Sequence, residues 1–341
     1  MSRIGIDCRF SGTHSGLGRY TRELVTHLVS LSSDNTYVLF VRSSSEPWLI
    51  QISQNVTIVE TDVPHYSIAE HFSLSRIFKS AKIDILLSPH FNVPYFYTGP
   101  FITVIHDLIL HRYPNSASFL KRCAYKVLMS RTVRKAKKII AVSNFTASEI
   151  RKFYGKPIAK KTSVVGEGVT DAFTPSTGDR VRDTLKRHKI PSPYFLYVGN
   201  CKEHKNVQRL LDAHKASGVS NQLVLVTKPE SLQLHDGVTI LTDVPEFDLP
   251  PLYTGATAFI SASLYEGFGL PFIEARACEC PVIGVSGSSV SEVIGDGSLV
   301  LDSVDALANA FRNPPSSASK DVPQWSSAAE QVLNLLQSLT S

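Results

Sequence analysis

The chain has 341 residues, of which 43% are hydrophobic and 19% are charged, and its net charge is +5. This length predicts about two domains, and the composition excludes a wholly disordered chain. No apolar run in the sequence approaches the roughly 18 residues that a membrane-crossing helix needs. Met1 leads directly into an expected first strand and the five cysteines fit reduced thiols, so we expect a cytoplasmic protein without a secretion signal.

Charge is divided unevenly along the chain. Residues 1–170 carry a net charge of +11, whereas residues 171–341 carry −6. The basic excess is concentrated between Lys121 and Lys138, where no acidic residue interrupts the cations. Two parts of opposite sign indicate two domains with different partners.

Short β-branched or aromatic runs alternate with helical patterns along the whole chain, which is typical of parallel sheets covered on both faces. Turn-forming residues between about Asp171 and Pro193 predict a domain boundary there. We therefore predict an α/β protein with two doubly wound Rossmann-like domains, 1–172 and 173–323, that face each other across a cleft. The expected strands are 4–7, 37–41, 56–59, 83–87, 101–105, 138–142, 163–165, 195–198, 223–227, 238–241, 258–261, 282–285 and 299–301; the expected helices are 18–31, 117–136, 144–154, 204–217, 270–279, 289–294, 303–311 and 326–339.

The strongest chemical signal is the loop that follows the expected strand 258–261. It contains Glu266 and Glu274, and Gly-Phe-Gly-Leu-Pro-Phe-Ile stands between them. Glycines let a backbone approach a ligand closely, and amide groups at a helix start attract an anion. Two carboxylates beside a phosphate site suit a sugar nucleotide, although a glycine-rich turn with two solvated glutamates has the same spacing. The residues that would form this site are Glu266, Gly267, Phe268, Gly269, Leu270 and Glu274.

This segment resembles the E-x7-E motif of retaining family-4 glycosyltransferases, which have the fold known as GT-B. The resemblance implies that Glu274 binds the ribose hydroxyls of a nucleotide and that Glu266 contacts the donor sugar. The backbone between them would hold the diphosphate. Family members usually have glycine where Glu279 stands, a difference that concerns the end of a helix rather than the chemistry.

A second loop, after the expected strand 195–198, contains lysines that could pair with a phosphate group. In the family a basic pair here clamps the donor pyrophosphate, and Lys205 matches its second member. Asn200 stands where the first member is often arginine, and Lys202 could substitute from a shifted position. The resemblance thus places Asn200, Lys202 and Lys205 at the donor, and we expect Val244, in a later loop, to lie near the nucleotide base.

Two loops in the first domain complete the expected site. Gly16 and Gly18 open a helix after the first strand, but Thr21 stands where a dinucleotide-binding fingerprint needs a third glycine. In the resembling family this loop closes over the donor phosphates, and Arg19 would lie on the acceptor side. His106 ends a buried strand, and it resembles the family histidine that reaches the transferred sugar by a hydrogen bond or through its carbonyl group.

Three further features are interpreted as mainly architectural. Asp107 is expected to lie on the acceptor side and to orient the loop beside His106 rather than to act as a base. Ser143 or Asn144 suits a helix N-cap, and Ser143 could also contact the acceptor. Trp325, with Ala328 and Ala329, resembles the family's terminal helix, so the resemblance implies that 324–341 packs back on the first domain.

These residues predict a hexosyltransferase in which His106, Lys205 and Glu266 are catalytic. It would move a hexose, with mannose favoured, from a nucleotide diphosphate sugar to a hydroxyl of a surface-polysaccharide or lipid-linked glycan acceptor. The donor could be linked to GDP or UDP. We expect no cofactor and no metal site, because an Asp-x-Asp pair is absent from the sequence.

The basic segment 119–138 combines cations with Phe119, Leu120 and Val127. This pattern is typical of a helix lying on an anionic membrane, although a solvated basic face fits it equally. Nucleic acid is not an expected partner, because no aromatic platform accompanies the charge.

Other functions remain open on the sequence alone. A nucleotide-sugar epimerase with the same fold would need no acceptor. Transfer of glucose or N-acetylhexosamine from a UDP-sugar, an inactive binding protein and a Rossmann dehydrogenase are further alternatives, the last with an incomplete fingerprint.

Overall fold

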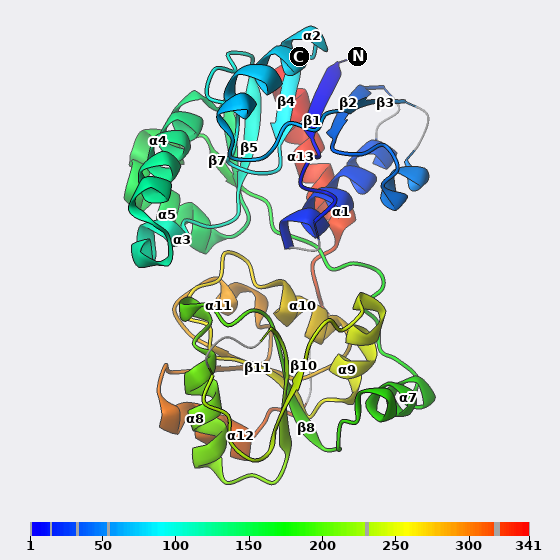
Figure 1. Cartoon of the computed structure of the whole chain (residues 1–341), viewed down its shortest axis with the longest axis vertical. Helices are drawn as coiled ribbons and strands as arrows, with labels where there is room; N and C mark the ends of the chain where they lie inside the picture. The colour runs from blue at the N-terminus through cyan, green and yellow to red at the C-terminus, as the bar shows by residue number, and fades with distance from the viewer. Residues whose placement is uncertain are drawn as a thin grey trace. The chain divides into compact units, whose positions relative to one another are not determined.

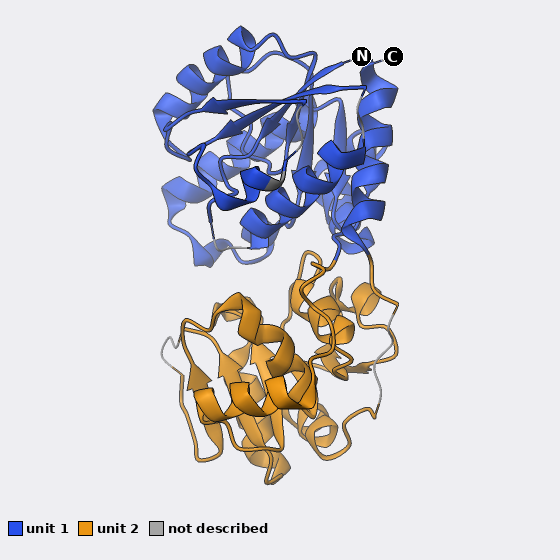
Figure 2. Ribbon diagram, turned by 90° about the vertical axis from the view of Figure 1, so that its right-hand side faces the viewer, with its two compact units in different colours: residues 1–168, 324–341 blue, residues 169–323 orange. Residues whose placement is uncertain are grey.

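The computed structural model describes residues 2–13, 16–31, 34–52, 55–228, 232–316 and 321–340. The chain divides into two compact units, one made of residues 1–168 and 324–341 and the other of residues 169–323 (Figure 2). Each unit holds one parallel sheet with helices on both faces (Figure 1). The predicted fold class, two Rossmann-like α/β domains of the GT-B type, is confirmed.

The sheet of the first unit has the strand order β3-β2-β1-β4-β5-β6-β7. Its strands are runs of buried apolar residues, as expected for a sheet covered on both sides. The order reverses between β1 and β4, so the loops after these two strands diverge and leave a crevice at their carboxyl ends. The strands are β1 (Arg3–Asp7), β2 (Thr36–Val41), β3 (Val56–Glu60), β4 (Ile85–Ser88), β5 (Phe101–Ile105), β6 (Lys138–Ala141) and β7 (Thr162–Val164).

The helices of the first unit include the last element of the chain. Helix α13 packs against α1 beside the sheet, and Trp325 at its start is buried against Tyr20 of α1, with ring centroids 5.3 Å apart. The helical elements are α1 (Gly16–Leu31), η1 (Pro47–Gln51), the π-helix η2 (Glu70–Leu74), α2 (Ser75–Ser80), α3 (Ile109–Arg112), η3 (Pro114–Ser116), α4 (Phe119–Lys135), α5 (Asn144–Tyr154), α6 (Lys156–Ala159) and α13 (Trp325–Thr340).

The second unit repeats the plan with the strand order β10-β9-β8-β11-β12-β13, which reverses between β8 and β11. Its strands are β8 (Tyr194–Val198), β9 (Gln222–Val226), β10 (Val238–Leu241), β11 (Ala258–Ser261), β12 (Val282–Val285) and β13 (Ser298–Val300). Its helical elements are α7 (Gly178–His188), η4 (Glu203–Lys205), α8 (Val207–Ser217), η5 (Glu246–Asp248), α9 (Leu249–Gly255), α10 (Leu270–Ala277), α11 (Val290–Val293) and α12 (Val304–Arg312).

Two helices of the second unit were not expected. Helix α7 lies inside the stretch read as a linker; the Thr177 hydroxyl accepts a hydrogen bond from the Arg180 amide and thereby caps it. Helix α9 contains Pro250 and Pro251, which argue against a helix on sequence grounds. Both prolines stand in its first turn, where a missing N–H costs no intrahelical hydrogen bond.

Glu279 follows α10 with a left-handed backbone, at φ +58°. A non-glycine residue costs about 1–2 kcal/mol in this conformation. Glu279→Gly removes this strain, but part of the stability gained is lost because glycine loses more chain entropy on folding. We expect the variant to raise the free energy of unfolding by about 0.5–1 kcal/mol in urea titrations.

The matched control is Glu292→Gly. Glu292 is exposed in α11, where glycine is unfavourable, and this variant should lower the free energy of unfolding by about 1 kcal/mol. Equal effects of the two substitutions would contradict the assignment of strain to Glu279.

Candidate active site

The site in the second unit forms where the strand order reverses, between β8 and β11. The loop after β8 carries Lys205 and the loop after β11 carries Glu266. The Lys205 Nζ atom lies 2.6 and 2.7 Å from the two carboxylate oxygens of Glu266. The side chains are 16% and 12% exposed, so the ion pair is shielded from water yet reachable. In such sheets ligands bind in this crevice.

The two loops are also joined through their backbones. The Leu264 amide donates to the His204 carbonyl over 2.8 Å. The Ser289 hydroxyl, contributed from beside α11, lies 2.9 Å from the carbonyl oxygen of Glu266 and 2.8 Å from that of Phe268. The loop that precedes α10 is therefore fixed at both ends. Ser289 belongs to this support, although no local sequence pattern singles it out.

Helix α10 starts directly after this loop. Gly269 occupies its N-cap at φ +106°, which is accessible to glycine and strained for other residues. Pro271 stands in the first turn, and Leu270 begins the helix. The amides of 268–270 therefore form the positive end of a helix, which favours an anion such as a phosphate group.

Glu274 lies one turn into α10 and is only 3% exposed. The Tyr253 hydroxyl of α9 donates to its Oε2 atom over 3.1 Å. A buried carboxylate needs such donors, because burial without a hydrogen bond is costly. Tyr253 thus orients the carboxylate that the resemblance assigns to the ribose, and the sequence alone did not reveal this partner.

Three other residues expected to contact the donor, namely Asn200, Lys202 and Val244, form no side-chain hydrogen bond or ion pair with Lys205 or Glu266 within the described part of the chain. Asn200 and Lys202 are both exposed, and the Asn200 side chain accepts the Lys202 amide over 3.2 Å. Asn200 therefore shapes the turn after β8. Val244 is half-buried and follows β10, the edge strand of the sheet.

His204 lies between Lys202 and Lys205 in the loop after β8 and is 7% exposed. Burial, followed by the neighbouring Lys205 charge, lowers its pKa to about 4. The His204 imidazole is therefore neutral near pH 7. The cation that pairs with Glu266 is Lys205.

In the first unit, His106 follows β5 and pairs with Glu167. Its Nδ1 lies 3.0 Å from Glu167 Oε1 and its Nε2 lies 2.8 Å from the Pro89 carbonyl oxygen. Both partners are acceptors, so only the doubly protonated ring can donate to each. Burial by itself lowers the pKa of His106, but the hydrogen bond and charge of Glu167 outweigh it and the pKa is raised. Glu167 was not identified from the sequence.

The neighbours of His106 have mainly structural roles. Asp107 accepts the Ile109 amide over 3.0 Å and so stabilises the turn before α3. The Ser143 hydroxyl accepts the Thr146 amide over 3.0 Å as the N-cap of α5, and the Thr146 hydroxyl donates to the His106 carbonyl over 3.3 Å.

The glycine-rich segment begins α1 at Gly16. Gly18 is buried, and a Cβ atom there would lie 2.1 Å from the Thr13 carbonyl oxygen. A side chain is thus excluded by the preceding loop. Arg19, the next residue, is half-buried.

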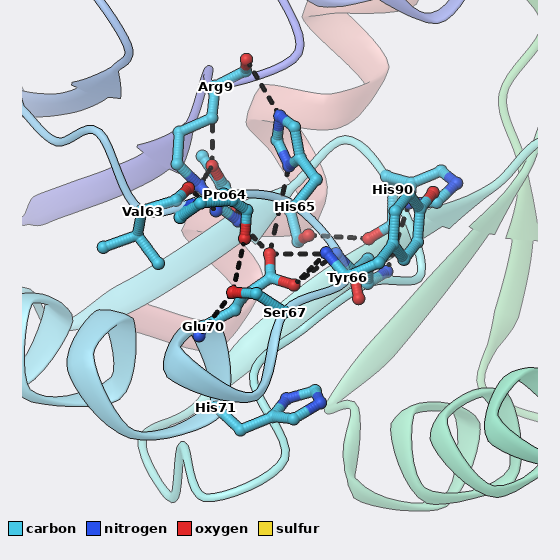
Figure 3. Close-up of polar contacts among 12 residues, drawn as sticks. Arg9, Val63, Pro64, His65, Tyr66, Ser67, Glu70, His71 and His90 are labelled. Atoms are coloured by element: carbon cyan, nitrogen blue, oxygen red, sulfur yellow. Dashed lines mark hydrogen bonds and ion pairs between the residues drawn. The ribbon is translucent and has the colours of Figure 1, made fainter.

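The first unit contains a buried network of charged residues that was not predicted from the sequence (Figure 3). Arg9, which follows β1, is fully buried; its Nε and Nη2 atoms contact Asp7 at 2.8 and 2.9 Å, and Nη2 also lies 2.6 Å from Glu70 Oε1. The Asn92 side-chain amide donates to both Glu70 oxygens, at 2.9 and 3.0 Å. Glu70 stands 61 residues from Arg9, a distance that local sequence patterns do not bridge.

Two Rossmann-like units, each built on a parallel sheet whose strand order reverses once, are the architecture of GT-B glycosyltransferases. The Glycosyltransferase Family 4 model matches residues 14–173, and the model of glycosyl transferases group 1 matches residues 182–314. The chain belongs to the family-4 glycosyltransferases and is a hexosyltransferase.

Several known proteins resemble the whole chain or most of it. It is 25% identical to O-antigen chain mannosyltransferase B of Escherichia coli, over 86% of this chain and 85% of the relative. It is 28% identical to O-antigen chain mannosyltransferase RfbU of Salmonella typhimurium, over 68% of this chain and 65% of the relative. The structure of Anabaena HepE in complex with UDP and glucose aligns with a TM-score of 0.74 at 17% identity, covering 100% of this chain and 99% of HepE.

The described residues contain neither a helix that could span a membrane nor a cluster that could hold a metal ion. No helix among them is long and apolar enough to cross a membrane. They contain no group of three or more His, Cys, Asp or Glu side chains that could hold a metal ion.

The His106–Glu167 pair predicts a defined pH dependence of stability. Because the folded pKa of His106 is raised, the pair stabilises fully below the unfolded pKa of about 6.5, and this contribution is lost as pH rises through the folded pKa. Glu167→Gln should lower the free energy of unfolding by about 1.5–3 kcal/mol at pH 5.5. The deficit should shrink at higher pH.

Urea titrations of both proteins between pH 5.5 and pH 9 measure this deficit. Tyr20, His90 and Asp107 also face His106, and they are unchanged in both proteins. A deficit that stays constant with pH would show that His106 is not the titrating partner.

Proposed function

We propose that the protein transfers a mannosyl residue from a nucleotide diphosphate sugar, GDP-mannose first, to a hydroxyl group of a surface polysaccharide or its lipid-linked precursor. The arrangement that carries the proposal is the Lys205–Glu266 ion pair beside the amide groups that begin α10. The names of the two O-antigen mannosyltransferase relatives support mannose as the sugar and a surface glycan as the acceptor. The UDP and glucose bound to HepE support a sugar-nucleotide donor.

The reaction needs stabilisation of a departing diphosphate. As the bond to the sugar breaks, negative charge grows on the leaving phosphate oxygen, and preorganised positive groups lower that barrier. Lys205 and the amides of 268–270 are the groups placed for this, while Glu266 would contact the sugar and Glu274 the ribose. The family resemblance supports retention of the anomeric configuration, with the acceptor attacking on the face from which the diphosphate leaves.

His106 would act mainly through its backbone. Both ring nitrogens already contact acceptor oxygens, so the ring is committed to Glu167 and Pro89. Its carbonyl oxygen accepts one long hydrogen bond from Thr146 and retains a second lone pair. That lone pair is suited to a hydroxyl group of the transferred sugar.

We expect Lys205→Ala to lower kcat for transfer by about 10²–10³-fold, the loss that follows removal of one preorganised charge contact. Glu274→Ala should lower kcat/KM for the donor, because it removes a contact to the ribose. Lys215→Ala is the matched control, because Lys215 is exposed on α8 and should leave kcat unchanged. Transfer of radiolabelled mannose from GDP-mannose measures the effect, with thermal melts to verify folding. Undiminished turnover in both variants would reject the site.

A second measurement separates donors and reaction types. GDP-mannose, UDP-glucose and UDP-N-acetylglucosamine are compared by thermal shift, since a ligand at about 100 times its Kd stabilises by about 2.7 kcal/mol. The strongest shift is expected with GDP-mannose. An epimerase would instead convert the sugar nucleotide without any acceptor, which product analysis detects.

We also propose that 119–138 associates with an anionic membrane surface. In α4 the side chains of Phe119, Leu120 and Val127 are 68%, 78% and 58% exposed, and cations surround them. The basic surface is smaller than the sequence predicted, because Arg131 turns inward, where it donates to the Tyr97 carbonyl and stacks over Phe101.

Binding to phosphatidylglycerol vesicles tests this association. We expect binding at 20 mM salt that falls sharply by 300 mM, since the screening length shrinks to below about 8 Å. Leu120→Glu should weaken it severalfold. The control is Leu234→Glu, at a residue 52% exposed in the second unit. Equal binding by the two variants would dismiss the α4 surface.

A further inference from the structure

Glu167 reaches His106 across one intervening strand of the first sheet. His106 directly follows β5, Glu167 stands three residues past the end of β7, and β6 pairs with both strands. Because the three strands are parallel, the two residues lie at the same edge of the sheet. Two strand spacings amount to about 10 Å, and the two side chains close this gap to a contact of 3.0 Å.

The backbone beside Glu167 is held in place by the last helix of the chain. A Cβ atom on Gly168 would lie 2.2 Å from the amide nitrogen of Trp325, at the start of α13, so the two segments pass in close contact. Glu167 itself is 5% exposed. Its carboxylate therefore approaches His106 from a fixed position and away from water, where the attraction between opposite charges is stronger.

The ring of His106 is bounded on three sides. Nδ1 faces Glu167 Oε1 and Nε2 faces the Pro89 carbonyl oxygen, and Tyr20 of α1 packs edge to face against the ring, with centroids 4.5 Å apart. A ring with one proton donates to one of the two oxygens and turns a lone pair toward the other, which is unfavourable in a buried site. The ring keeps both contacts only while it carries two protons.

These contacts also act on the backbone of His106. A side chain anchored at both ring nitrogens has one conformation open to it, and that conformation restricts the backbone of its own residue. The carbonyl oxygen of His106 is further oriented by the Thr146 hydroxyl, which donates to it over 3.3 Å. The direction of this carbonyl group thus depends on the ring staying where Glu167 holds it.

We propose that Glu167 is a positioning residue for hexosyl transfer: it holds the His106 ring in its doubly protonated form, and the ring fixes the direction of the His106 carbonyl group. The inference deepens the proposed function and rests on it, because that function assigns the carbonyl group to a hydroxyl of the transferred sugar. Transfer then depends on the second proton of His106. As pH rises through the pKa of His106, one ring contact is lost and the rate falls.

The groups that face His106 are Glu167, Tyr20, His90 and Asp107. Burial, followed by the Glu167 charge, raises the pKa of Tyr20, and burial, followed by the His106 charge, lowers the pKa of His90. Both groups are therefore neutral between pH 6 and pH 9. Burial also opposes the second proton on His106, but the hydrogen bond and charge of Glu167 outweigh it and raise the pKa of His106.

Glu167→Gln and Glu167→Ala separate the charge of Glu167 from its contact. A glutamine amide accepts from a protonated Nδ1 and, in its flipped orientation, donates to an unprotonated one, so Glu167→Gln holds the ring in either state. We expect the rate of the wild type to fall about tenfold between pH 6.5 and pH 9, and that of Glu167→Gln to stay within about twofold. Glu167→Ala should lose about 10–100-fold in kcat at every pH, because a misplaced group costs that much.

Glu149→Gln is the matched control. Glu149 is likewise a buried carboxylate of the first unit, at 2% exposed, but it pairs with Arg112, whose guanidinium group keeps its charge throughout this pH range. This variant should retain the alkaline fall of the wild type. Transfer of radiolabelled mannose from GDP-mannose is measured on the full chain at each pH, with thermal melts to verify folding.

The protonation of His106 is followed separately, through its ring nitrogen chemical shifts in 15N-labelled protein. The midpoint of this titration should lie about one pH unit or more lower in Glu167→Gln than in the wild type. A pH-independent wild-type rate, an alkaline fall that persists in Glu167→Gln, undiminished kcat in Glu167→Ala or an unchanged midpoint would each overturn the inference. A wild-type protein that transfers no sugar would instead refute the proposed function, and the titration midpoint would still decide whether Glu167 holds the second proton.

Discussion

The start of α10 is the constraint on which the donor site depends. Its amides can face an anion only if the preceding loop turns sharply, and Gly269 at φ +106° makes that turn. The Ser289 hydroxyl then fixes the loop through the Glu266 and Phe268 carbonyls. Because the same loop carries Glu266, its position also sets the position of the Lys205 ammonium group. One backbone conformation therefore places both the helix start and the cation.

The two units use the same topological position in opposite ways. At the strand-order reversal of the second unit, the Lys205–Glu266 pair is partly exposed. At the corresponding place in the first unit, Arg9 and Glu70 are fully buried. Removing Arg9 would leave the Asp7 and Glu70 carboxylates buried without their shared cation, which is strongly unfavourable. The partly exposed Lys205–Glu266 pair is suited to chemistry, whereas the buried Arg9–Glu70 pair is suited to holding the shape of the first unit.

Regular elements were largely predictable because parallel strands are continuous apolar runs bounded by turn residues. The strands 101–105, 238–241, 258–261 and 282–285 were predicted with the bounds they have. Contacts between distant residues were not, because Arg9 meets Glu70 and His106 meets Glu167 across 61 residues in each case. The loops proposed to hold the donor were singled out by local spacing and a family resemblance. Tyr253, Ser289 and Glu167 follow only from the packing of several elements.

The charge balance of the donor site limits what Lys205 can do. Its charge is matched by Glu266 at 2.6 Å, which offsets part of the attraction that Lys205 exerts on a phosphate group. A helix start supplies about half a unit charge, less than a diphosphate carries. Further positive charge must come from another residue, and Asn200 cannot provide it. Lys202 is exposed in the same turn, and its amide donates to the Asn200 side chain. Asn200 thus shapes the turn, and the proposed donor site would draw its remaining positive charge from Lys202.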